Sequence, residues 1–173
     1  MNDTEILDFI YAILPAIVIG LLSFYFFYTY FKGEENRRRF LILRENQKTA
    51  LPIRLQAYER FALFLERISP GKILFRVKAT SEDLDMYSNL LIASIEQEFE
   101  HNIAQQIYVS NECWDYVKTA KNATISMIRN AAGKESVTNP DELRELILKS
   151  LMDRQPPTDA ALSYIKKEVK SLT

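Results

Sequence analysis

The sequence predicts an all-α protein with one N-terminal transmembrane helix followed by a cytoplasmic bundle of about five helices. Two observations predict this fold class. A run of 23 residues without a charged side chain, Phe9 to Phe31, lies close to the N-terminus. Beyond it, apolar residues recur three and four positions apart between helix-start and helix-stop signals, which is the pattern of amphipathic helices. The 173 residues include only four glycines and no internal repeat, which agrees with this prediction.

The uncharged run is long enough to cross a bilayer. As a helix it would span about 34 Å, at about 1.5 Å per residue, against a hydrocarbon core of about 30 Å. Seven of its last eight residues are aromatic, and tyrosines there suit the headgroup region, where the ring is buried and the hydroxyl stays hydrated. A cleaved signal peptide is disfavoured, because the segment before the run is acidic and no small-residue cleavage site follows. We therefore predict an uncleaved anchor.

Charge is distributed unevenly around this anchor. Residues 1–31 carry three acids and no Lys or Arg, whereas residues 32–78 carry 12 Lys and Arg against five Asp and Glu. Flanking cations favour the cytoplasmic side of a span. The lone cysteine, Cys113, has no partner for an internal disulfide, which agrees with a reducing compartment. These features predict four segments: a short extracytoplasmic N-terminus (1–8), a transmembrane helix (9–31), a basic juxtamembrane helix or linker (32–50) and a cytoplasmic helical domain (51–173).

Within the span, small residues recur every four positions, at Ala12, Ala16 and Gly20. Such a small-residue edge lets a second transmembrane helix approach closely. The alternative is the ordinary Ala and Gly content of transmembrane helices. We keep this edge as a candidate packing site.

A cluster of cations follows the span, at Arg37, Arg38 and Arg39. Beside a membrane each cation attracts anionic lipid with about 1 kcal/mol. The cluster is therefore a candidate contact for lipid or for an acidic partner. The alternative is that it only sets the topology.

The domain is predicted to begin with an amphipathic helix at Leu51-Pro52, because proline suits the first turn of a helix. Aromatic side chains widen the apolar face of this helix, at Tyr58, Phe61 and Phe64. The face is broad enough to dock a partner protein. The alternative is that all three side chains belong to the core of the domain.

The segment after this helix, Lys72 to Lys78, is predicted to be an extended connector that buries Ile73 and Phe75; a lone strand is the alternative. Four further signals predict helix boundaries. Thr80 or Ser81 is expected to start a long helix that ends near Val109, Ser110 or Asn111 a second helix, Asn139-Pro140 a third, and Thr158 or Asp159 the last.

Candidate chemistry is sparse. Glu98 and His101 lie three positions apart on a predicted helix, a spacing that di-iron helical bundles use twice, but His101 is the only histidine and Cys113 the only cysteine. No phosphate-binding glycine-rich loop occurs. We therefore predict no enzyme, no catalytic residue, no metal site and no cofactor. Nucleic-acid binding is disfavoured, because five glutamates interleave with the basic segment beside the span.

The stretch LPIRLQAYERFALFLERISP, Leu51 to Pro70, together with the acidic-headed anchor and the arginine cluster, resembles an uncharacterised family of small single-span inner-membrane proteins of the Bacteroidota. The resemblance implies a bacterial inner-membrane location. It implies no activity and no site residues.

Two functions are compatible with these features. The first is a membrane-anchored helical interaction or scaffold protein, an accessory subunit of a bacterial inner-membrane complex, whose partner is another membrane or cytoplasmic protein or a second copy of the chain. The alternative is an anchored metal-binding or enzymatic bundle that uses Glu98 and His101.

Overall fold

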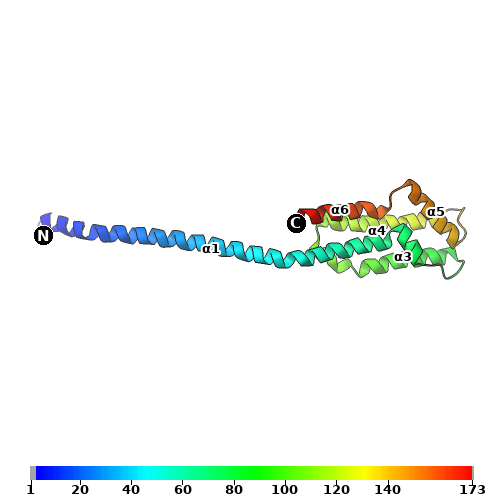
Figure 1. The fold of residues 1–173 in the computed structure, drawn as a ribbon, viewed down its shortest axis with the longest axis horizontal. Helices are drawn as coiled ribbons and strands as arrows, with labels where there is room; N and C mark the ends of the chain where they lie inside the picture. Colours follow the sequence, from blue (N-terminus) through cyan, green and yellow to red (C-terminus); the bar gives the residue numbers. More distant parts are fainter. Residues whose placement is uncertain (1–2, 173) are drawn as a thin grey trace. The chain divides into compact units, whose positions relative to one another are not determined.

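The computed structural model describes residues 3–172, and every regular element in this range is helical. Side chains are described for these residues except 3–12, 33–36, 40, 43, 44 and 46–49. Figure 1 shows the helices in chain order from α1 to α6. No strand occurs among residues 3–172, so the all-α prediction is confirmed.

The chain divides into two compact units, residues 1–49 and 50–173. Helix α1, Asp3–Ile68, includes the described part of the first unit and the first helical segment of the second. The prediction that a new helix begins at Leu51-Pro52 is wrong, because α1 is continuous through both residues. Proline removes one backbone hydrogen bond from a helix, but no glycine lies between Gly33 and Gly71 to help end it.

Residues 70–76 form a short helix, α2 (Pro70–Arg76), where the sequence predicts an extended connector. Ile73 is buried as expected, whereas Phe75 is 83% exposed, so the prediction is wrong for the conformation and for Phe75. The reason is that side chains repeat their direction with a different period in an extended segment and in a helix. An extended segment buries alternate residues, but this short helix buries the neighbours Ile73 and Leu74.

Helix α3 (Leu84–Glu100) begins later than predicted. Its N-cap is Asp83, not Thr80 or Ser81. The Asp83 carboxylate accepts a hydrogen bond from the backbone N–H of Met86 at 2.9 Å. An aspartate cap satisfies an otherwise unpaired N–H and also places a negative charge at the positive end of the helix dipole.

Helix α3 also ends earlier than the predicted end near Val109. It stops at Glu100, and a 3-10 helix, η1 (Ile103–Tyr108), follows. The Asn102 side chain donates a hydrogen bond to the Glu98 carbonyl oxygen at 2.8 Å. That bond occupies an acceptor that a continuing α-helix would use, and asparagine side chains compete with helices in this way.

The starts of the last three helices agree closely with the sequence. Ser110 caps α4 (Asn111–Ala132), and Asn139 caps α5 (Pro140–Asp153); each side chain accepts a hydrogen bond from a backbone N–H three residues ahead. Helix α6 (Pro157–Leu172) starts one residue before the predicted position, because proline itself takes the first helical turn.

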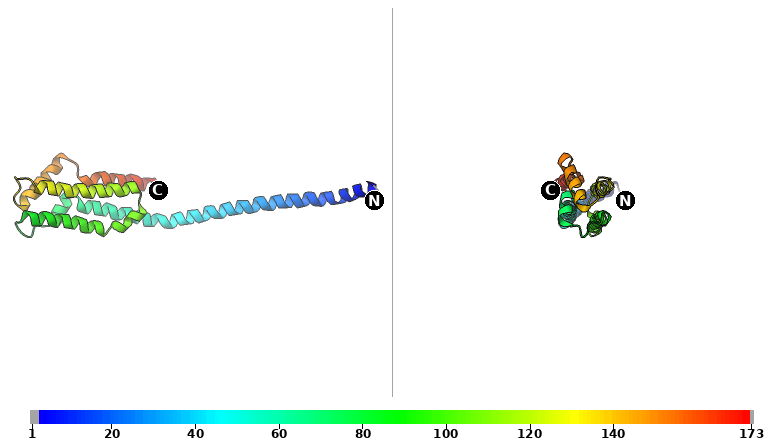
Figure 2. Two further views of the ribbon diagram at one scale, coloured as in Figure 1. Left: turned by 180° about the vertical axis from the view of Figure 1, so that it is seen from behind. Right: turned by 90° about the vertical axis from the view of Figure 1, so that its right-hand side faces the viewer.

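In the second unit, the last part of α1 lies beside α3, α4 and α6, and α2 and α5 lie at one end (Figures 1 and 2). The C-terminus lies at the opposite end, where α1 enters the unit, so α6 runs antiparallel to that part of α1.

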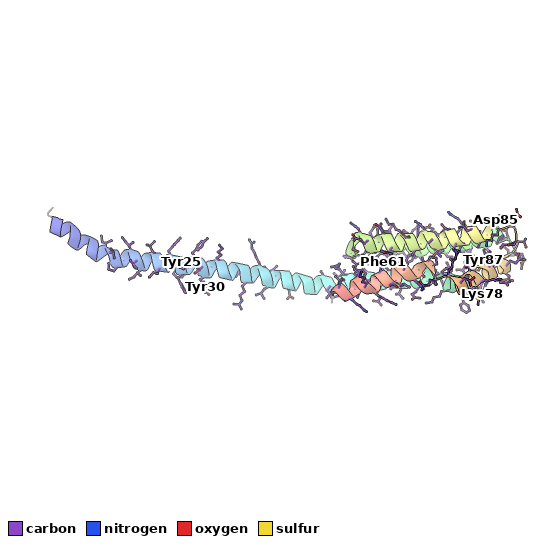
Figure 3. The ribbon with its side chains drawn as sticks, turned by 90° about the horizontal axis from the view of Figure 1, so that it is seen from above. Tyr25, Tyr30, Phe61, Lys78, Asp85 and Tyr87 are labelled. Carbon is purple, nitrogen blue, oxygen red and sulfur yellow. The ribbon has the colours of Figure 1, made fainter. Side chains whose placement is uncertain are left out.

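Four aromatic rings join three of these helices in the core. Phe61 and Trp114 have ring centroids 5.6 Å apart, Trp114 and Phe99 5.2 Å, and Phe99 and Phe64 5.8 Å. Figure 3 shows Phe61 among the packed helices. Such ring pairs each add about 0.5–1.5 kcal/mol beyond the burial of their apolar area. The rings therefore fix α1 against α3 and α4.

The exposures on α2 predict effects of very different size for two substitutions on one short helix. Ile73→Ala removes a fully buried side chain and is expected to lower the free energy of unfolding by about 2–5 kcal/mol. Phe75→Ala, at an exposed position, is expected to change it by less than about 0.5 kcal/mol. Denaturant unfolding of the detergent-solubilised chain measures both. An equal loss for the two variants would contradict the helical register of α2.

Candidate functional site

The most distinctive surface of the molecule is an apolar stretch of α1. Every side chain from Ile13 to Lys32 is exposed, and among the described residues Ile13–Arg39 is the one helical segment long and apolar enough to cross a membrane. The aromatic residues stack along the helix four positions apart, with centroids 6.4 Å apart for Phe24 and Tyr28 and 6.3 Å for Phe26 and Tyr30.

One polar side chain of this stretch, Thr29, is satisfied in a way that suits lipid. The hydroxyl of Thr29 hydrogen-bonds to the carbonyl oxygens of Tyr25 and Phe26, at 3.0 and 2.9 Å. This matters because a hydroxyl without a partner is costly in hydrocarbon. Figure 3 shows Tyr25 and Tyr30 projecting from the helix. The Lys32 ammonium lies 5.8 Å from the ring centre of Tyr28, a cation–π contact where the apolar stretch ends.

The small-residue edge is described in part. Ala16 and Gly20 are exposed, and a Cβ added at Gly20 would meet nothing within 4 Å. The side chain of Ala12 lies outside the described residues. Approach of a second transmembrane helix to this edge stays a prediction.

The arginine cluster lies on the same helix, and Arg37, Arg38 and Arg39 are all exposed. This exposure is what contact with a lipid headgroup or an acidic partner requires. Neither contact is tested by the geometry of the chain alone.

The aromatic face at Tyr58, Phe61 and Phe64 lies in the core of the domain. These side chains are 1%, 0% and 1% exposed. All three side chains are therefore buried in the folded domain, as the core alternative expects, and Tyr58 also lines the groove described below.

Glu98 and His101 have different surroundings in the structure. The Glu98 carboxylate forms ion pairs with Arg67 at 2.7 Å and with Arg76 at 3.0 Å, whereas His101 is an exposed residue at the end of α3. Within residues 3–172, no described group of three or more His, Cys, Asp or Glu side chains is placed to hold a metal ion. Glu98 instead links α3 to α1 and α2.

A polar network that the sequence analysis missed lies at the end of the domain where α1 enters. The Tyr58 hydroxyl donates a hydrogen bond to Glu168 Oε1 at 2.8 Å, which joins α1 to α6. Glu168 Oε2 is buried and has no hydrogen-bond partner among the described residues. Arg54, one turn before Tyr58, donates to the Tyr108 carbonyl oxygen at 3.2 Å. The network therefore connects α1 with α6 and with η1.

This network changes the acidity of two buried groups. Burial and the hydrogen bond to Glu168 raise the pKa of Tyr58 to about 12, although Arg54 opposes the shift. Burial and the nearby Glu168 carboxylate raise the pKa of the Cys113 thiol to about 12 as well. A thiol with so high a pKa carries little thiolate at neutral pH, and thiolate is the reactive form. The geometry therefore gives Cys113 a packing role.

One signal in the sequence points to Glu168. Ile165, Val169 and Leu172 form the apolar stripe of α6, and an acid three residues after Ile165 falls on that stripe. An acid at such a position needs a partner on a neighbouring helix. Which helix supplies it depends on the packing, so Tyr58 could not be identified from the sequence.

Beside this network, a groove runs between the last part of α1 and α6, with a volume of about 450 Å³. Apolar side chains form most of its lining, and charged side chains stand at its rim. Eight residues line this α1–α6 groove: Leu55, Tyr58, Glu59, Ala62, Ile165, Lys166, Val169 and Lys170.

A second apolar surface lies where α2 and α5 meet. A Cβ added at Gly71 would lie 3.9 Å from Leu151 Cδ1, which shows the close approach of the two helices. Phe75 on α2 is 83% exposed and Met152 on α5 is 86% exposed. Large apolar side chains at this exposure lower solubility unless something covers them.

Residues 4–172 match the model of a family of unknown function (DUF7935). The chain belongs to this family. No curated protein and no solved structure matches the chain. DUF7935 covers nearly the whole sequence, which agrees with the expected membership of an uncharacterised family, and its description gives no activity, membrane location or site residue.

The raised pKa values predict that this DUF7935 protein loses stability at alkaline pH. A group whose pKa is higher in the folded state stabilises the fold below its unfolded pKa, and this contribution disappears as pH rises through the folded pKa. For Cys113 and Tyr58 the loss should extend from about pH 9 to about pH 12. The measurement is the free energy of unfolding against pH.

Variants separate the two contributions. Cys113→Ala and Tyr58→Phe each remove one titrating group, so each should show a shallower alkaline loss than the unsubstituted chain. Tyr116→Phe, at a 43% exposed position, is the matched control and should retain the full slope. Identical slopes for all four proteins would show that neither buried group causes the loss.

Proposed function

We propose that this chain is a single-span protein of a bacterial inner membrane that holds a cytoplasmic helical domain at the bilayer and acts there as an interaction or scaffold subunit. The observation that carries the proposal is the uncovered apolar stretch of α1, Ile13 to Phe31. Burying one large apolar side chain is worth about 1.5–3 kcal/mol. A bilayer supplies that burial for the whole stretch, and the described chain supplies none of it.

The orientation is supported by charge. The arginines at 37–39 are exposed on the C-terminal side of the stretch, whereas residues 1–8 contain no Lys or Arg. Cations within about 15–20 residues of a span favour retention in the cytoplasm. Residues 50–173 then lie in the cytoplasm, where a single buried thiol stays reduced.

An interaction role is supported by what the domain exposes and by what it buries. Of its candidate chemical groups, Glu98 is engaged in ion pairs and Cys113 is packed in the core, and the exposed His101 belongs to no described group of metal-ligating side chains. Its exposed Phe75 and Met152 are apolar side chains of the kind that partner proteins cover. The proposed partners are a membrane or cytoplasmic protein of the same complex, or another copy of the chain.

Membrane extraction tests the anchor. The chain is expected to stay in the membrane fraction through high salt and alkaline carbonate and to leave it only in detergent. A variant with Ile19→Arg and Leu22→Arg places two charges in the apolar stretch, each of which costs about 2.5–3.5 kcal/mol near the bilayer centre, so it should become extractable or fail to insert.

The matched control carries the same two charges elsewhere. Gln97→Arg and Thr119→Arg lie at exposed positions of the helical domain, and this variant should remain in the membrane fraction. Release of the unsubstituted chain by carbonate would contradict the proposed function.

A further inference from the structure

The α1–α6 groove is apolar at its floor and carries opposite charges on its two sides. Leu55, Ala62 and Val169 line it and are only partly buried by the chain itself. The α6 side of the groove carries two lysines, of which Lys170 already has an interaction within the chain. The other two charged residues, Glu59 on the α1 side and Lys166 on the α6 side, have exposed side chains. Neither forms a hydrogen bond or ion pair within residues 3–172, so both charges are available to an occupant.

The network next to the groove fixes the relative height of these two charges. The hydrogen bond from the Tyr58 hydroxyl to the Glu168 carboxylate keeps the two residues at similar positions along the helix axes, and α1 and α6 run antiparallel here (Figures 1 and 2). Glu59 lies one residue after Tyr58, and Lys166 lies two residues before Glu168, so both are displaced in the same direction. At about 1.5 Å per residue, these displacements are about 1.5 Å and about 3 Å, so Glu59 and Lys166 stay at similar positions along the helix axes.

We propose that the α1–α6 groove is the interface between two copies of this chain, related by a two-fold axis parallel to these helices. Rotation about such an axis leaves the position of each residue along the helix axis unchanged. It therefore sets α1 of one copy against α6 of the other and brings Glu59 opposite Lys166 of the second copy. The same rotation produces the reciprocal pair, as an isologous interface requires. Two ion pairs then flank a shared apolar floor.

The mixed charge of the rim favours this occupant over two others. An acidic helix or an anionic lipid headgroup would be attracted by Lys166 but repelled by Glu59, and a basic partner would meet the reverse. A second copy places its Lys166 opposite Glu59 and its Glu59 opposite Lys166, so the charges on both sides of the groove attract it. The inference deepens the proposed function by naming a partner and rests on it, because anchoring in one bilayer raises the local concentration of the copies.

Crosslinking between differently tagged full-length chains tests the interface. In a Cys113→Ala background, one chain carries Glu59→Cys and the other Lys166→Cys, and the two are co-reconstituted in lipid vesicles and oxidised. A disulfide between the two tags is expected. It cannot arise within one chain, because each chain has a single cysteine.

The control pairs Lys166→Cys with Ala93→Cys, an exposed position on α3, and should crosslink at least about tenfold less. Charge reversal gives a second readout. Glu59→Lys and Lys166→Glu are each expected to weaken dimerisation at least threefold, by about the effect of one or two exposed ion pairs, and the double reversal should restore it.

Crosslinking no greater than that of the control, or a monomer of the unsubstituted chain in vesicles, would overturn the dimer. So would a monomer that carries a lipid in the groove, detected by native mass spectrometry and lost on Val169→Trp. Carbonate extraction separates the two proposals. A chain that stays in the membrane but is monomeric contradicts only the dimer, whereas a dimeric chain released by carbonate contradicts the anchor.

Discussion

The constraint on which the molecule depends is the need to cover the apolar surface of α1 between Ile13 and Phe31. Its side chains are exposed, its aromatic rings stack only on one another, and its Thr29 hydroxyl is satisfied by the backbone of its own helix. A surface of this kind is stable in lipid and aggregates in water. In the function proposed above, a bilayer covers this surface, and the flanking charges support the proposed orientation.

The second unit has a core of its own. Phe61, Phe99 and Trp114 join α1, α3 and α4, and the hydrogen bond from Tyr58 to Glu168 joins α1 to α6. Phe61 and Phe64 of α1 are buried in this core, and Tyr58 is buried beside the α1–α6 groove. What remains for interaction is the groove beside it and the exposed apolar side chains of α2 and α5. The same segment of α1 therefore stabilises the domain and lines its α1–α6 groove.

Much of the fold could be predicted from local sequence, because a cap or a long apolar run acts within a few residues. Ser110 and Asn139 are examples, since each side chain bonds to its own helix. The errors fall where local signals compete or where packing decides. Pro52 does not end α1, Asn102 ends α3, and the helical turn of α2 exposes Phe75. The partner of Glu168 depends on which helices become neighbours, and one sequence does not give that information.

The central claim is that α1 crosses a membrane with residues 50–173 on the cytoplasmic side. The most direct measurement is labelling of single cysteines in intact cells with a membrane-impermeant maleimide, in a Cys113→Ala background. Asn2→Cys is expected to react in cells with a permeable outer membrane, whereas Thr119→Cys should react only after lysis. Reaction of Thr119→Cys in intact cells would contradict the orientation, and equal protection of both positions until lysis would contradict a membrane-spanning helix.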